Sequence, residues 1–579
     1  MLYASVCHTD LLFANGFPIG GGEHWRGSDR TERRGPCDSD PCSRIDPKTP
    51  LPDATFLSCG FSTGYGAAWK EPMLQNASSV AVFGLGPNPM KEAKGQAFGM
   101  TDFINPKHSD KPIAELVKDL TGGMGVDYSL ECTGVPPLIN QAILSTKLGT
   151  GKIIQIGVTE ESNVNINILE LFFERTLKGL TFGGLKAKTD LPIIYEKCKN
   201  REIQLDELKS HEIKLEDANK VSELLKQPDC FEYQNKQGNS FICFRPWSLL
   251  PTMSSTNSHV ITCKGIVSWG KGEPLKVEEI QVEPPKSYEV RVKMLYAGSI
   301  GEGVTGLREG DLVIPTYVAE CRTCENCMSE KTNLCLKYPT SYNGLMLDGS
   351  SRMTIGGQTA YHAFSCSTWC QYMVINLNFL LKIDPKTPLP DATFLSCGFS
   401  TGYGAAWMEP LLQNASSVAV FGLGPVGLGN PMKEAKGKAF GMTDFINPEQ
   451  SDKPIAELVK DLTGGMGVDY SLECTGVPPL INQAILSTKL GTGKIIQIGV
   501  PEEAKVNINI SELLFGRTLK GSIFGGLKPK TDLPIIFEKC KNREIQLDEL
   551  KSHEIKLEDA NKVSELLKQL DCVKILINI

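Results

Sequence analysis

The sequence of 579 residues predicts an α/β protein whose main domain, a doubly wound parallel sheet of the dinucleotide-binding type, occurs twice. Three observations support this prediction: a long internal duplication, a buried strand that leads into a glycine-rich turn, and a cluster of four cysteines. The chain is long enough for about four domains at the usual ~150 residues each.

The duplication sets the domain organisation. Residues Ser109–Val158 and Ser451–Val500 are identical at all 50 positions, and weaker similarity relates residues 45–230 to 383–572. Solenoid units have roughly 20–50 residues, so this repeat is a whole domain. The predicted order is a remnant of a first β domain at 1–44, a nucleotide-type domain at 45–230, a linker at 231–252, a β domain at 253–396, and a second nucleotide-type domain with a C-terminal return at 397–579.

The β domain of the second copy is predicted from alternation. Apolar residues alternate with polar ones in Ile261–Trp269, Val277–Val282 and Val290–Leu295, and glycine and proline separate these runs. Period-two segments with this punctuation are typical of a small antiparallel sheet.

Four cysteines follow these strands and form the strongest chemical signal. Cys321, Cys324, Cys327 and Cys335 have the spacing C-x2-C-x2-C-x7-C. This spacing lets one compact loop place four thiolates around a tetrahedral zinc ion with no open position. The sequence therefore predicts a structural zinc site; the alternative is four free thiols on a loop.

A dinucleotide fingerprint begins the second nucleotide-type domain. The buried strand Ser417–Phe421 runs into Gly422, Gly424 and Gly427, which form a G-x-G-x-x-G turn. Such glycines let backbone amides approach a pyrophosphate, provided that a helix follows. The later segments Val468–Cys474, Pro479–Ser487 and Lys494–Gly499 continue a strand, helix, strand rhythm.

Composition excludes several other classes. The net charge is -7 without a long block of like charge, so neither nucleic acid nor an anionic membrane is an expected partner. There is no run of about 18 uncharged apolar residues and no basic start followed by an apolar segment. We therefore expect a cytoplasmic protein, in which most of the 19 cysteines are buried apolar residues or metal ligands.

These motifs resemble the zinc-dependent medium-chain alcohol dehydrogenases, in particular the plant type, over residues 1–230 and 253–579. The resemblance rests on the cysteine lobe, on the runs L-S-C-G-F-S-T-G-Y-G-A-A-W and F-G-L-G-P-V-G-L-G, and on F-G-G-L-K. It implies a GroES-like β domain joined to a doubly wound Rossmann-type NAD domain, usually as a dimer. It also implies hydride transfer between an alcohol or aldehyde and NAD, with the substrate oxygen held on a second, open zinc.

The resemblance also assigns residues to the open zinc site. In the family its ligands come from a C-x-T-D motif, a G-H-E motif and the S-C-G motif. The first copy keeps Cys7 and Cys59, which would bind zinc, and Thr9, which would relay the proton, but it has no G-H-E. The second copy keeps only Cys397, and His362 has the position of a structural histidine.

The cofactor region is shortened in both copies. By resemblance, Gly422, Gly424, Gly427 and Val500 would contact NAD. Both glycine-rich turns pass directly into N-P-M-K-E-A-K-G, where the family has a helix and a strand that ends in the acid that binds the ribose. Asp444 has a suitable spacing from the glycine-rich turn to be this acid, but its run G-M-T-D-F-I-N-P matches the next strand of the family. A short helix over Met432–Phe440 would rebuild the crossover one strand short, so we expect weak NAD binding.

The first β domain is interrupted by an out-of-frame segment. Asp29–Asp40 can be encoded so that a shift of one base reads T-G-L-R-E-G-D-L-V-I-P-T, which is Thr305–Thr316 of the second copy. Two interpretations remain. One is an alcohol dehydrogenase acting on a primary alcohol or S-hydroxymethylglutathione, as a homodimer. The other is a catalytically inactive zinc-binding protein, from damaged or misjoined tandem genes, which would pair with intact paralogues.

Overall fold

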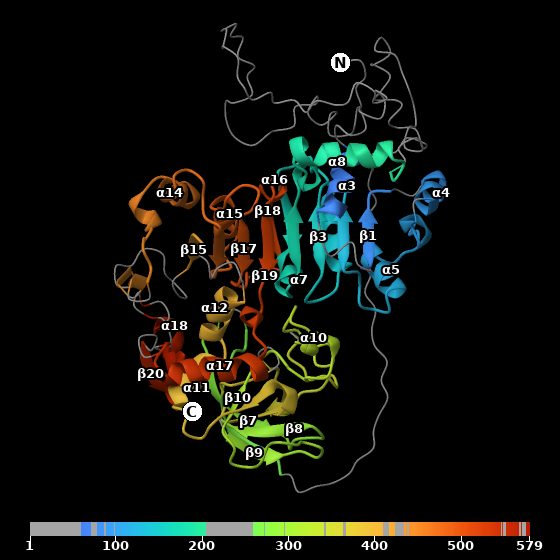
Figure 1. Ribbon diagram of the computed structural model, residues 1–579. Coiled ribbons are helices and arrows are strands. Elements are labelled where there is room, and N and C mark those ends of the chain that lie inside the picture. The colour runs from blue at the N-terminus through green and yellow to red at the C-terminus, as the bar shows by residue number, and fades with distance from the viewer. Residues whose placement is uncertain are drawn as a thin grey trace.

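The computed structural model describes residues 60–70, 78–85, 89–97, 99–203, 259–270, 273–294, 296–340, 343–362, 366–408, 416–422, 434–435, 437–438, 441–545, 547, 552–566, 569, 572 and 575–579. Three parts follow one another along the chain: a first repeat, a β domain with the cysteine lobe, and a second repeat (Figure 1). The predicted domains at 1–44 and 231–252 lie outside the described residues.

The first repeat alternates helices with short strands. Its elements are α3 (Gly60–Trp69), β1 (Val80–Phe83), α4 (Pro89–Ala97), η2 (Pro106–His108), α5 (Ile113–Leu120), β2 (Tyr128–Glu131), α6 (Pro136–Leu144), β3 (Lys152–Gln155), β4 (Asn163–Asn167), α7 (Ile168–Phe172), β5 (Thr176–Gly179), η3 (Thr181–Gly184) and α8 (Ala187–Lys199). Local sequence explains several boundaries. Proline begins α6, where its missing N–H is not needed, and the side chain of Asn105 caps η2.

The β domain forms small antiparallel sheets. Its elements are β6 (Ile261–Val267), β7 (Lys276–Val282), β8 (Glu289–Lys293), β9 (Tyr296–Ile300), β10 (Val313–Pro315), α10 (Glu325–Met328), β11 (Met353–Ile355), β12 (Gln358–Thr359), β13 (Tyr372–Asn376), η6 (Leu377–Phe379) and β14 (Leu380–Lys382). Strands β6 and β7 pair over seven residues, and β13 pairs with β8. The three alternating runs in the sequence are therefore confirmed as β6, β7 and β8.

The second repeat has the same order as the first. Its elements are α11 (Leu389–Leu395), α12 (Gly398–Trp407), β15 (Val418–Phe421), η8 (Pro448–Gln450), α14 (Ile455–Leu462), β16 (Tyr470–Glu473), α15 (Pro478–Leu486), β17 (Lys494–Gln497), β18 (Lys505–Asn509), α16 (Ile510–Leu514), β19 (Thr518–Gly521), η9 (Phe524–Gly526), α17 (Pro529–Lys541), β20 (His553–Lys556), η11 (Leu557–Lys562), α18 (Val563–Leu566) and β21 (Ile575–Asn578). The predicted strands and helix at 417–421, 468–474, 479–487 and 494–499 correspond to β15, β16, α15 and β17.

The two repeats share one eight-stranded sheet. Its order is β1-β2-β3-β5-β19-β17-β16-β15, which is the same pattern when read from either end. Within each repeat the strands are parallel, and the central pair β5 and β19 is antiparallel. Strands β4 and β18 form a separate two-stranded ribbon across the junction. Figure 1 shows the teal strands of the first repeat beside the orange and red strands of the second.

Each half of this sheet has fewer strands than expected. Doubly wound dinucleotide domains commonly have six strands in the order 3-2-1-4-5-6. Among the described residues each repeat contributes four, and β1 and β15 lie at the outer edges. The run G-M-T-D-F-I-N-P, which matches a family strand, is irregular at 99–105 and again at 441–447. The expectation of one missing strand is thus corrected to two, because this segment has no neighbouring strand to pair with.

The shortened crossover contains a helix in the first repeat. Helix α4 begins at Pro89, the counterpart of Pro431, and the backbone N–H of Gly99 closes its end on the carbonyl of Gln96. In the second repeat, residues 434–435 and 437–438 are helical. These four residues agree with the predicted replacement helix over Met432–Phe440, whose other residues lie outside the described part of the chain.

The main hydrophobic core belongs to both repeats at once. One continuous cluster contains Ile139, Ile166 and Leu177 of the first repeat together with Ile508 and Leu519 of the second. A second cluster lies under the sheets of the β domain, and a third joins that domain to α17 and η9. None of the helices in the described part of the chain has the length and apolar character needed to cross a bilayer.

Candidate metal centre and cofactor turn

The four predicted cysteines converge in the lobe after β10. The Sγ atoms of Cys321, Cys324, Cys327 and Cys335 all lie within 4.8 Å of one another. The pairs Cys321–Cys327 and Cys324–Cys335 are each separated by 3.9 Å. Zinc–sulfur bonds of about 2.3 Å in a tetrahedron place the sulfurs about 3.8 Å apart. The residues therefore fit a closed zinc site.

Local hydrogen bonds lower the pKa of two of these thiols. Burial acts to raise the pKa of Cys321. The backbone N–H and the hydroxyl of Thr323, each 3.4 Å from the sulfur, have the opposite and larger effect, and the pKa falls to about 6. Burial also opposes the ionisation of Cys324, yet the N–H of Cys327 at 3.4 Å helps to bring its pKa below the usual value. Burial raises the pKa of Cys335. Because the thiolate is the metal ligand, these hydrogen bonds favour the form of Cys321 and Cys324 that binds zinc.

The lobe is fixed to the second repeat by buried polar contacts. The Nδ2 atom of Asn333 donates to the carbonyls of Ile523 at 2.8 Å and Leu527 at 3.1 Å. Lys528 donates to the carbonyl of Cys327 at 3.0 Å and also to that of Ser329. These contacts fix the lobe to the turn that precedes α17.

The carboxylate of Glu320 caps helix α17 from the lobe. It accepts the backbone N–H of Lys530 at 2.7 Å and of Thr531 at 3.0 Å. These donors belong to the first turn of the helix, where N–H groups lack the usual intrahelical partner four residues earlier; the N–H of Thr531 also donates to the carbonyl of Lys528 at 3.1 Å. Glu320, Asn333 and Lys528 were not identified from the sequence, because their role depends on contacts about 190–210 residues apart along the chain.

Of the predicted ligands of the second, open zinc site, only Cys397 lies among the described residues. Cys397 lies directly before α12, and its side chain is exposed. Within the described part of the chain, the four-cysteine lobe is the only group of three or more potential ligands within reach of one ion. Cys7, Thr9 and Cys59 lie outside the described residues.

His362 has the environment of a structural histidine. Its side chain is buried, and Nδ1 lies 3.2 Å from the hydroxyl of Ser367. Burial, with a smaller contribution from the charge of Arg352, lowers its pKa to about 4. The imidazole is therefore neutral at physiological pH, in agreement with the role expected from its sequence position.

The cofactor turn is described only at its start. Gly422 has φ +99°, a conformation that favours glycine, and an added Cβ would lie 2.7 Å from the methyl group of Thr475. Gly424 and Gly427 lie outside the described residues. Val500 follows β17 at the carboxyl edge of the sheet and is 50% exposed. Asp444 is exposed and lies outside any strand, so the strand to which the sequence assigned it does not form.

A buried glutamate at the same edge was missed in the sequence. Glu473 ends β16, and its carboxylate accepts the N–H groups of Thr475 and Gly476 at 2.9 Å and the amide of Gln497 at 2.7 Å. Glu131 makes the same contacts in the first repeat, where burial raises its pKa. The signal was the run E-C-T-G after a strand, present in both repeats. These carboxylates hold the turn that borders the cofactor edge.

Comparison with known proteins finds relatives of both the repeats and the β domain. The family model described as "Zinc-binding dehydrogenase" matches residues 73–196 and 426–540, and "Alcohol dehydrogenase GroES-like domain" matches 296–385. The "CYP enzymes assisting alcohol dehydrogenase" of Catharanthus roseus is 50% identical over 374 residues, which cover 55% of this chain and 100% of that protein. "Alcohol dehydrogenase 1" of Tanacetum cinerariifolium is 49% identical, with 55% and 98% covered.

Solved structures include benzyl alcohol dehydrogenase from Acinetobacter calcoaceticus, which is 20% identical with a TM-score of 0.48; the match covers 55% of this chain and 99% of that one. Two copies of the dehydrogenase domain, a GroES-like domain between them and full-length similarity to plant enzymes show that the chain belongs to the zinc-dependent alcohol dehydrogenase family.

Proposed function

We propose that this member of the family binds one zinc ion in the four-cysteine lobe, where the metal has a structural role. The observation that supports this proposal is the convergence of four sulfur atoms within 4.8 Å, which leaves no position for substrate. Bound zinc would fix the loop that carries Glu320 and Asn333, and these residues hold the second repeat. The ion would thus order the junction between the β domain and the second repeat.

We further infer that the chain has lost the family's hydride transfer between an alcohol or aldehyde and NAD. An open zinc with three protein ligands polarises the oxygen of the substrate. The second repeat keeps only Cys397 of that ligand set, and the first keeps Cys7 and Cys59 without the histidine motif. Thr9, the expected proton relay, precedes the out-of-frame segment. Neither copy therefore contains a complete set.

Weak NAD binding is part of this proposal. Gly422, Gly424, Gly427 and Val500 are the residues that would hold the cofactor. The strand that carries the ribose-binding acid is absent beside β15 in the described part of the sheet, so one wall of the crevice is incomplete. We expect calorimetric titration of NAD to show a dissociation constant well above the micromolar range; micromolar affinity would contradict this part of the proposal.

A second candidate function is an active NAD-dependent alcohol dehydrogenase. It is favoured by 50% identity to a plant relative over that protein's whole length. The substrate would be an alcohol or aldehyde, with S-hydroxymethylglutathione among the candidates, and Cys7, Thr9 and Cys59 would have to complement the second repeat. The cytoplasm is the expected location for either function.

Metal content and turnover of the full chain distinguish the two functions. We expect one zinc per purified chain by elemental analysis and no NADH formation from ethanol, longer primary alcohols or S-hydroxymethylglutathione. Two zinc ions with NADH formation would support the active enzyme. A matched sample with Cys397→Ser should keep the single zinc under the structural proposal, whereas it should lose the second ion and the turnover if the chain is active.

A further inference from the structure

The junction between the repeats is built from strand edges that face each other. In the central pair, Leu519 lies opposite Leu177 and Thr518 opposite Lys178, so β19 and β5 each cover the other's open edge. In the ribbon, Asn165 lies opposite Asn507 at the centre of five paired positions. Open strand edges readily recruit other strands. Here each repeat supplies the strand that the other one lacks.

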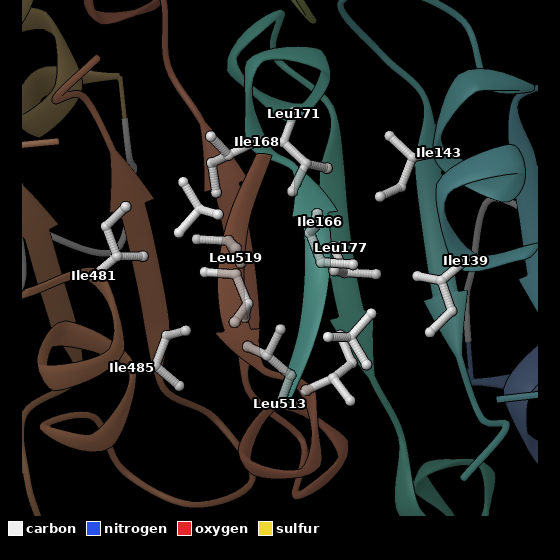
Figure 2. Close-up of a cluster of buried hydrophobic side chains, with 14 of the residues drawn as sticks. Ile139, Ile143, Ile166, Ile168, Leu171, Leu177, Ile481, Ile485, Leu513 and Leu519 are labelled. Carbon is white, nitrogen blue, oxygen red and sulfur yellow. The ribbon is translucent and has the colours of Figure 1, made fainter. Parts of the chain in front are cut away.

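The same junction buries a continuous apolar surface. Ile166 and Leu177 of the first repeat and Ile508 and Leu519 of the second are fully buried in one cluster. Figure 2 shows Ile166, Leu177 and Leu519 side by side where the two repeats meet. Separation of the repeats would expose these side chains to water, at about 25 cal/mol for each Å² of apolar surface. The junction therefore resembles a domain core rather than a loose contact.

Two side-chain hydrogen bonds across the junction start from the first repeat and have no counterpart that starts from the second. The carboxylate of Glu174 in the first repeat accepts the buried backbone N–H of Ile523 at 3.0 Å. The hydroxyl of Thr181 donates to the carbonyl of Leu514 at 2.7 Å. At the matching positions the second repeat has Gly516 and Ile523, which offer neither group. A pair of two second repeats would therefore lose both hydrogen bonds.

The cysteine lobe adds a third contact between the repeats. A Cβ at Gly149 of the first repeat would lie 2.4 Å from the hydroxyl of Thr332, which belongs to the lobe. Thr332 is buried there. The lobe, which lies between β10 and β11 of the β domain, thus packs against the first repeat as well as against the second.

We propose that the two repeats close each other's pairing surface within a single chain. The partner for this surface is the other repeat of the same polypeptide, and the surface is not available to a second copy of the chain or to a single-repeat relative. The proposal is independent of whether the chain is catalytically active. It implies that any homodimer would have to use a different surface.

Engineered cysteines across the ribbon test this proposal in the full chain. Asn165 and Asn507 are exposed and directly opposite, and opposed residues on antiparallel strands have Cα atoms about 4.5–5.5 Å apart, a span that a disulfide accepts. After mild oxidation, the double variant N165C/N507C should form a disulfide within one chain. It should run as a single chain of 63.3 kDa on a denaturing, non-reducing gel, with a mass spectrum that identifies the linked peptides.

Two controls keep the test decisive. The single variants N165C and N507C should give no such link, and a mixture of the two, co-expressed in one host, should give no dimer joined through these positions. A 165–507 disulfide between two chains would show that the surface pairs chains and would overturn the proposal. Failure of both thiols to link, while each reacts with a maleimide reagent, would overturn it as well.

Discussion

At the scale of single residues, Asn333 is one of the buried polar links between the lobe and the second repeat. It is buried and donates to two buried carbonyls, those of Ile523 and Leu527. Asn333→Ala should leave the carbonyl of Leu527 without this donor, whereas that of Ile523 still accepts the N–H of Gly526 at 3.0 Å, and the change should cost about 1–3 kcal/mol. We expect a lower urea concentration for zinc release, followed with a chromogenic chelator. The exposed Asn200→Ala should leave this midpoint unchanged; an unchanged midpoint in both variants would contradict the role of Asn333.

His362 predicts how stability depends on pH. Its pKa is about 4 in the folded chain, against a usual value of 6.5, because burial and Arg352 disfavour the charged ring. The unfolded chain therefore binds the proton more strongly. The free energy of unfolding should fall as the pH decreases from about 6.5 to about 4, by up to about 3 kcal/mol from this group.

The variant His362→Gln should reduce that slope, which denaturant midpoints at pH 7 and pH 5 would show. His108→Gln provides the control, because this histidine is exposed on the first repeat. Equal slopes for the parent chain and His362→Gln would show that the buried imidazole does not contribute.

At the scale of elements, the cysteine lobe is the part whose fold should depend on metal. Cys335→Ser removes one of four sulfur ligands, and a structural zinc site lost in this way no longer contributes its binding energy to folding. We expect the zinc content to fall from one to near zero per chain and the thermal midpoint of the β domain to decrease. Cys132→Ser, at an exposed cysteine, should retain both. Full zinc content in the Cys335 variant would exclude the four-sulfur site.

Elements with a local signal could be predicted from the sequence, and those that depend on distant partners could not. Periodicity and glycine turns located β15, β16 and α15, and cysteine spacing located the four-cysteine lobe. The run around Asp444 was misjudged, because a strand forms only beside a paired neighbour and the intervening strand is missing. The pairing of β5 with β19 could not be predicted from the sequence either, because a repeat shows that two domains are alike but not which of their strand edges pair.

At the scale of the whole molecule, the shared core predicts that the repeats unfold together. Ile166 is fully buried in the cluster that spans both repeats. Ile166→Ala should cost about 2–5 kcal/mol. Hydrogen exchange should then increase in β5 and also in β19, which peptides from 159–182 and 501–524 can distinguish because their sequences differ. Ile193→Ala, at an exposed position, should change neither.

The identical segments provide a second readout of the same prediction. Peptides from 109–158 and 451–500 have the same mass, so each reports both repeats at once. If Ile166→Ala loosened only its own repeat, such a peptide would split into two isotope envelopes of equal size. Because the junction joins the two halves into one core, we expect a single envelope at higher deuterium content. Two envelopes would mean that each repeat is stable without the other, and that the common core does not couple them.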